Sequence, residues 1–255
     1  MSLEAKIREE LKSKGILLMT HLVLGYPSFE ENRRTIAAMA EAGVELIELQ
    51  IPFSEPSADG PVIVKANAES LERGTRVSEC LVFAKEIAAE FPQTCFLFMT
   101  YYNILFKAGE SNFLDAAKSA GIQALIIPDL PVEEAESLIQ GCRERGLSNI
   151  LIFTPTHRED RLKELAAKAE GFIYSVGRKG ITGQKTDFGQ EMTAQIERYR
   201  EATDLPLALG FGVSSKEDVD FLVGKVDIAV IGTKMIQVHR SSGAKGVGEF
   251  LSQLR

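Results

Sequence analysis

The chain has 255 residues, of which 45% are hydrophobic and 25% are charged, and its formal net charge is −7. This is an ordinary balance for a globular protein, and the length suits one α/β barrel domain. The basic residues are scattered and the longest apolar runs are too short to cross a bilayer, so we expect neither a nucleic acid nor a membrane partner.

The sequence begins with a charged amphipathic helix pattern over residues 3–13 and contains no apolar signal-peptide segment. Cys80, Cys95 and Cys142 are widely spaced, form no CxxC pair and are odd in number, which argues against a disulfide framework. We therefore expect a soluble cytoplasmic protein.

Apolar, β-rich runs alternate with amphipathic helical patterns along the rest of the chain. Their continuous apolar character is typical of parallel strands that are buried on both faces. The eight strand candidates are residues 17–24, 44–51, 94–100, 124–127, 149–153, 171–176, 206–209 and 227–231.

Helical patterns fill the intervals between these strands. Ser28 can cap the first of them, with Glu31 at its third position. The patterns cover residues 29–42, 77–90, 110–120, 132–145, 158–168, 191–201 and 216–224, and a further helix follows Gly246. We predict a single α/β domain over residues 1–255, a closed (β/α)8 TIM barrel with an extra N-terminal helix, and an open doubly wound sheet is the alternative.

In such a barrel the chemistry lies at the C-terminal ends of the strands. Gly210-Phe211-Gly212 follows the seventh strand, and Gly232-Thr233 follows the eighth and begins a helix at Lys234. Glycine backbones and a helix N-terminus can bind phosphate oxygens, and Gly183 could add an amide from the loop after the sixth strand. The functional interpretation of these glycines is a phosphate-binding site. The structural interpretation is that they form ordinary turns between strands and helices.

Two acids belong to the second strand and the loop after it. Alternation of side chains places Glu48 and Gln50 on one face of that strand. An acid inside a barrel is costly to bury unless it has a partner or a function, so Glu48 is either a general acid/base or a structural ion-pair residue. Asp59 lies in an Asp-Gly turn and can face the same pocket, and Asp129 ends another strand.

Aromatic and histidine residues near the strand ends are more ambiguous. Tyr174 lies in the sixth strand and could line the pocket, whereas Tyr101 and Tyr102 are more typical of packing. The three histidines show neither metal-ligand spacing nor a catalytic-triad pattern. We interpret His21 as an interior or packing residue and the other two as surface residues, and we expect no metal site.

The sequence resembles the tryptophan synthase α subunit from the first strand to the last. The most specific motif is Pro-Phe-Ser-Glu-Pro followed by Ala-Asp-Gly-Pro. The segments that carry the resemblance are residues 25–27, 47–61, 99–103, 128–134, 180–183 and 210–214.

The resemblance implies a (β/α)8 barrel that cleaves indole-3-glycerol phosphate to indole and glyceraldehyde 3-phosphate, a lyase step of tryptophan biosynthesis. It also implies an α2β2 heterotetramer in which indole passes to an allosterically coupled β subunit. That β subunit would hold pyridoxal phosphate, and this chain would hold no cofactor.

The resemblance further assigns roles to individual residues. Glu48 would be the general acid/base, Asp59 would bind the indole N–H, and Tyr174 would lie beside Glu48. Thr182 would help to close the loop after the sixth strand over the site. Substrate and phosphate contacts would come from Thr182, Gly183, Phe211, Gly212, Gly232 and Thr233, and the β subunit would face Pro52, Glu55, Asn103 and Pro131.

Gln50 departs from the pattern, because the family usually has glycine there. Its side chain would enter the pocket of Glu48 and either fill substrate space or hydrogen-bond the acid. The alternatives are therefore an active lyase, a weakened or inactive subunit that mainly binds and activates the β subunit, and another phosphosugar enzyme. Lesser departures are Ser57, Glu55, Gly177 and Lys179.

Overall fold

The structure is a computed structural model that describes residues 1–177, 189–210 and 212–255. The predicted phosphate-site residues Thr182, Gly183 and Phe211 and the departure at Lys179 lie outside the described residues.

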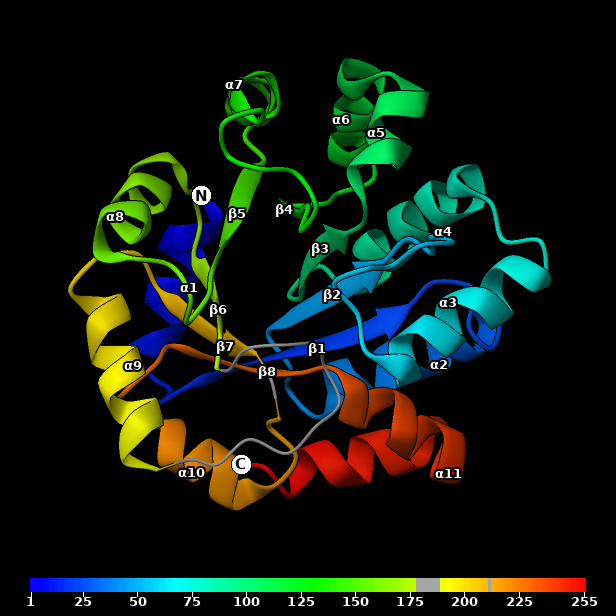
Figure 1. Ribbon diagram of the computed structural model, residues 1–255. Coiled ribbons are helices and arrows are strands. Elements are labelled where there is room, and N and C mark those ends of the chain that lie inside the picture. The colour runs from blue at the N-terminus through cyan, green and yellow to red at the C-terminus, as the bar shows by residue number, and fades with distance from the viewer. Residues whose placement is uncertain (178–188, 211) are drawn as a thin grey trace.

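Eight parallel strands of the described chain form a closed barrel in sequential order (Figure 1). Each strand pairs with the next one, and the barrel closes where residues 17–20 pair with residues 228–231. The strands are β1 (Leu17–Val23), β2 (Leu46–Gln50), β3 (Cys95–Met99), β4 (Ala124–Ile126), β5 (Ser148–Phe153), β6 (Ile173–Val176), β7 (Leu207–Gly210) and β8 (Ile228–Ile231). The predicted closed barrel is confirmed, and the open sheet is wrong.

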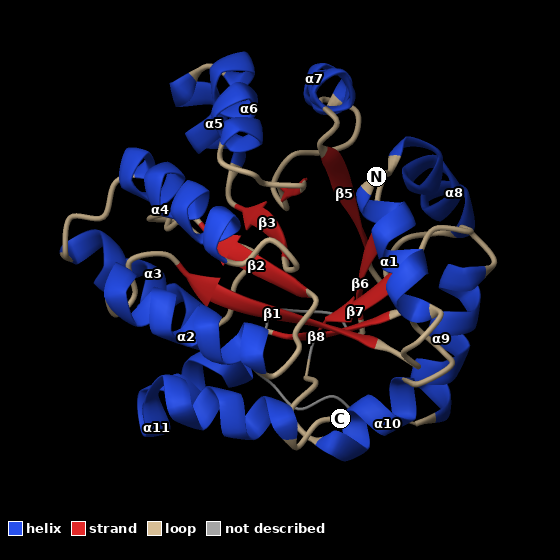
Figure 2. Ribbon diagram, turned by 180° about the vertical axis from the view of Figure 1, so that it is seen from behind, coloured by secondary structure: helices blue, strands red, loops and turns tan. Residues whose placement is uncertain are grey.

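Helices surround the barrel, and Figure 2 shows them from the opposite side. None of those in the described ranges is long and apolar enough to span a membrane. The helices are α1 (Leu3–Leu11), α2 (Phe29–Glu41), α3 (Pro61–Glu72), α4 (Val77–Glu90), α5 (Tyr102–Ala108), α6 (Glu110–Ser119), α7 (Glu136–Arg145), α8 (Glu159–Lys168), α9 (Gln190–Arg200), α10 (Lys216–Leu222) and α11 (Thr233–Ser252).

Four helical segments differ from the prediction. Helices α3 and α5 were not predicted, although Pro61 occupies a first-turn position of α3 that proline favours. Helix α7 begins at Glu136 because the segment before it forms turns. The sequence predicted one helix from Lys234 and a further one after Gly246, whereas in the structure both belong to α11, which begins at Thr233 and continues across a non-helical residue at Gly243.

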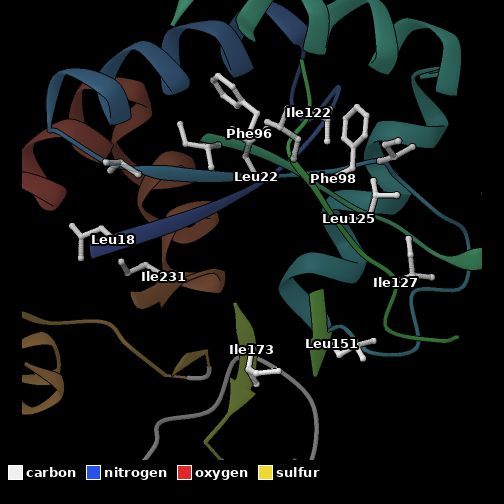
Figure 3. Close-up of a cluster of buried hydrophobic side chains, with 14 of the residues drawn as sticks. Leu18, Leu22, Phe96, Phe98, Ile122, Leu125, Ile127, Leu151, Ile173 and Ile231 are labelled. Carbon is white, nitrogen blue, oxygen red and sulfur yellow. The ribbon is translucent and has the colours of Figure 1, made fainter. Parts of the chain in front are cut away.

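Two apolar clusters fill the two sides of the strands. Ile47 and Leu49 of β2 belong to the cluster between strands and helices, and Figure 3 shows Leu18 and Leu22 of β1 in the same cluster. Leu46 belongs instead to a second cluster of alternating strand residues, which α1 joins through apolar side chains on its buried face. This alternation confirms that even-numbered residues of β2 face the barrel interior.

The N-terminal end of β2 carries a buried acid, Glu45, which is 8% exposed. Its Oε2 atom accepts a hydrogen bond from the Leu18 N–H at 2.8 Å. Its Oε1 atom lies 2.8 Å from the Lys14 ammonium and 2.7 Å from the Arg255 guanidinium. Glu45 thereby joins the segment after α1, the strand β1 and the C-terminal Arg255 at one end of the barrel.

We expect Glu45→Ala to lower the free energy of unfolding by about 2 kcal/mol, because it leaves the Leu18 amide and two cations without their shared acceptor. The urea midpoint of unfolding, followed by circular dichroism, measures this change. Glu9→Ala, which removes an exposed pair with Lys12, is the matched control and should leave the midpoint almost unchanged. Equal midpoints for the two variants would contradict the role of Glu45.

Candidate active site

Glu48 lies opposite His21 in the register of the two neighbouring strands β2 and β1. The His21 Nδ1 atom is 2.7 Å from Glu48 Oε1. The two residues are only 3% and 5% exposed, so water screens this contact weakly. The sequence interpretation placed His21 inside the barrel but missed its contact with Glu48.

The pKa of His21 is raised above its ordinary value. Burial is the largest single influence and lowers this pKa, but the hydrogen bond and charge of Glu48, the charge of Asp59 and the Gln50 side chain together outweigh it. The buried site therefore favours a positively charged imidazole beside the acids.

Asp59 lies in the loop between β2 and α3 and is 7% exposed. Its Oδ2 atom accepts hydrogen bonds from the Gln50 amide at 2.7 Å and from the Tyr101 hydroxyl at 2.9 Å. Burial raises the pKa of Asp59, although His21 and these two donors act in the opposite direction. The loop acid is thus held at the same end of the barrel as Glu48.

Gln50 connects Asp59 to helix α3. Its Oε1 atom accepts a hydrogen bond from the Asn67 amide at 3.2 Å, and Asn67 in turn accepts one from the Phe53 N–H at 2.9 Å. Gln50 was expected to contact Glu48 if it acted through a hydrogen bond. The hydrogen bonds described for its side chain go instead to Asp59 and Asn67.

Tyr174 lies in β6, where Gly210 of the neighbouring strand leaves room for it. A Cβ atom at residue 210 would lie only 2.4 Å from the Tyr174 hydroxyl. Burial, followed by the charges of Glu48 and Asp59, raises the pKa of Tyr174 well above its usual value. The tyrosine therefore stays neutral and lies within the field of both acids.

The candidate phosphate residues that are described follow β7 and β8. Gly212 has a positive φ of 90°, a conformation that glycine adopts without strain. Gly232 immediately precedes α11, and Thr233 is the first residue of that helix. The first N–H groups of a long helix have no partner within it and favour an anion. This end of α11 is close to His21, since a Cβ at residue 232 would lie 4.0 Å from the His21 Cβ.

Residues expected at the partner interface lie on the loops and helices after β2, β3 and β4. Glu55, Asn103 and Pro131 are exposed, whereas Pro52 is buried. Phe106, on the same helix as Asn103, is 71% exposed, and the sequence reading did not single it out.

No cluster of three or more His, Cys, Asp or Glu side chains able to hold a metal occurs within the described ranges. Cys80, Cys95 and Cys142 are buried and free.

The fold and the site define a class of protein: a (β/α)8 barrel enzyme with buried acids at the C-terminal ends of its strands. The sequence profile of the family Tryptophan synthase alpha chain matches residues 7–249. The tryptophan synthase alpha chain of Desulfotalea psychrophila is 52% identical, and the match covers 100% of both chains. This chain therefore belongs to the tryptophan synthase alpha chain family.

Solved structures agree with this assignment. A chain from Aquifex aeolicus is 32% identical, with a TM-score of 0.91 and coverage of 100% of this chain and 98% of that one. A chain from the tryptophan synthase α2β2 complex of Pyrococcus furiosus is 29% identical, with a TM-score of 0.86 and coverage of 94% and 97%.

We expect Asp59→Asn to raise the melting temperature. The raised pKa of Asp59 means that the fold favours its protonated form, so its ionisation weakens the folded state as pH rises through that pKa. An amide removes this effect, and we expect a gain of roughly 2–4 °C at pH 8 and a smaller gain at pH 5.

Calorimetry at both pH values measures these changes. Asp115→Asn is the control, because the Arg145 guanidinium lowers the pKa of Asp115, and this variant should gain nothing. A gain in melting temperature for Asp59→Asn that is larger at pH 5 than at pH 8 would contradict the conclusion that the fold favours the protonated form of Asp59.

Proposed function

We propose that this chain cleaves indole-3-glycerol phosphate to indole and glyceraldehyde 3-phosphate. The observation that carries the proposal is the pair of buried acids, each with its own partner: Glu48 with His21, and Asp59 with Gln50 and Tyr101. Acids in two different environments can divide the proton transfers of one reaction. Membership of the tryptophan synthase alpha chain family supports this substrate.

In the proposed reaction Glu48 gives a proton to the indole carbon that carries the glycerol chain. Asp59 accepts a hydrogen bond from the indole N–H and stabilises the positive charge that forms on the ring. The Glu48 carboxylate then takes the proton of the adjacent glycerol hydroxyl. The carbon–carbon bond breaks, its electron pair returns to the ring, and the aldehyde forms, so that Glu48 regains the proton it gave.

The phosphate would bind at the N-terminus of α11, where Gly232 and Thr233 would supply backbone N–H groups, and Gly212 would add another. Thr182, Gly183 and Phe211 would complete this site. Tyr174 would stand beside Glu48 as a neutral wall of the indole pocket.

The proposal includes a β subunit as partner. The exposed residues Glu55, Asn103, Phe106 and Pro131 offer a surface for it, and the similar chain from Pyrococcus furiosus is part of a tryptophan synthase α2β2 complex. We propose an α2β2 stoichiometry for this chain as well, in the cytoplasm. The buried Pro52 would support the interface, and the β subunit would hold pyridoxal phosphate.

Glu48→Gln tests the reaction. Loss of a general acid/base typically costs about 10²–10⁴-fold in rate, so kcat for indole release should fall by that factor while KM changes little. The assay is indole release from indole-3-glycerol phosphate, with the chain alone and with excess β subunit. No cleavage by the parent chain, together with faster serine-to-tryptophan turnover by the β subunit, would instead indicate a regulatory subunit without lyase activity.

The substitution Gln50→Gly tests whether the Gln50 side chain obstructs the substrate or supports Asp59. Because Gln50 holds Asp59 and Asn67, we expect kcat to fall by about tenfold, in line with the loss of buried hydrogen bonds to a charged group. Asn67→Ala leaves the Gln50 side chain in place but removes the bridge to α3, and it should also lower kcat. A higher kcat for Gln50→Gly would show that the glutamine obstructs the substrate.

A further inference from the structure

His21 has two properties that a histidine used only for packing rarely combines. It is almost fully buried, and one ring nitrogen makes a short contact with the acid proposed for catalysis. The other nitrogen, Nε2, is buried and has no hydrogen-bond partner among the described residues. A buried polar atom without a partner is uncommon, and a catalytic role is one of the explanations for it.

The groups that face His21 come from several elements. Glu48 of β2 makes an ion pair with it, and Asp59 from the following loop adds negative charge. The uncharged groups nearby are Gln50 of β2 and the backbone at Gly232 after β8. Tyr174 of β6 shares the field of the two acids and is neutral. Within the described ranges, the ion pair recorded for Glu48 is the one with His21.

We propose that His21 is a positioning residue for the cleavage reaction: it fixes the Glu48 carboxyl and shares one exchangeable proton with it. This inference rests on the proposed lyase function. Its geometric basis is the strand register, which holds both residues on rigid elements rather than on loops.

The proton balance of the pair follows from the contact between Nδ1 and Oε1. The shared proton moves from Nδ1 onto the carboxyl, and Glu48 gives a proton to the indole carbon. The carboxylate then faces an imidazole nitrogen without a hydrogen, which makes it a stronger base for the glycerol hydroxyl proton. That proton restores the pair to its starting state.

Two substitutions of His21 separate this role from packing. His21→Phe keeps a planar ring and removes both nitrogens, whereas His21→Asn keeps an N–H donor close to the position of Nδ1 but cannot take up a proton. In the β-bound indole assay we expect His21→Phe to lower kcat about tenfold or more with KM nearly unchanged, and His21→Asn to recover part of this loss.

The pH profile is the readout that packing alone would not move. In the parent chain kcat should fall as pH rises through the value at which the pair loses its proton. This fall of kcat at high pH should be absent or displaced in His21→Asn. The control His239→Asn, a substitution on the outer helix α11, should retain the parent profile. A parent-like kcat and pH profile for His21→Phe would overturn the proposal and leave the lyase function intact.

A histidine titration by NMR tests the shared proton without turnover. The His21 ring signals should titrate above the ordinary histidine range in the parent chain and move to lower pH in Glu48→Gln. An unchanged titration in Glu48→Gln would overturn the proposal. No cleavage by the parent chain would overturn the lyase function and the reaction role of His21 together, and the titration would then decide the shared proton by itself.

Discussion

The parallel register of β1 and β2 is the constraint on which the site depends. It sets His21 opposite Glu48, and without that neighbour a carboxylate inside the barrel would lack the partner that offsets the cost of removing it from water. The same register places Val23 opposite Gln50, and Gln50 in turn reaches Asp59. Both acids are thus organised from one strand pair.

Apolar and polar layers succeed one another along the barrel interior. Leu17, Met19 and Leu46 fill the lower part together with the buried face of α1, and the next inward positions of β1 and β2 are His21, Glu48 and Gln50. The apolar layer gives the fold its burial energy. Because its low dielectric lies directly beneath the polar layer, it also strengthens each hydrogen bond there. Stability and chemistry therefore occupy adjacent layers of the same strands.

The sequence predicted the order of the strands and the inward direction of Glu48 because alternation and apolar runs are local signals. It did not predict α3, although Asn67 of that helix supports Gln50. Nor did it predict the contact of His21 with Glu48. Alternation shows which face a side chain takes, but not which residue of the neighbouring strand lies opposite, since register depends on the packing of the whole sheet.

The pairing of β1 with β8 has a consequence for how the chain is made. Residues 17–20 of β1 find their hydrogen-bond partners on one side only in residues 228–231. During synthesis that side of β1 has no partner strand until more than two hundred further residues have been made. Until then it is an open strand edge, and such edges pair readily with other chains. The residues of β2 that pair with β1 follow it closely in the sequence, so both members of the His21–Glu48 contact are present in the nascent chain long before the barrel can close.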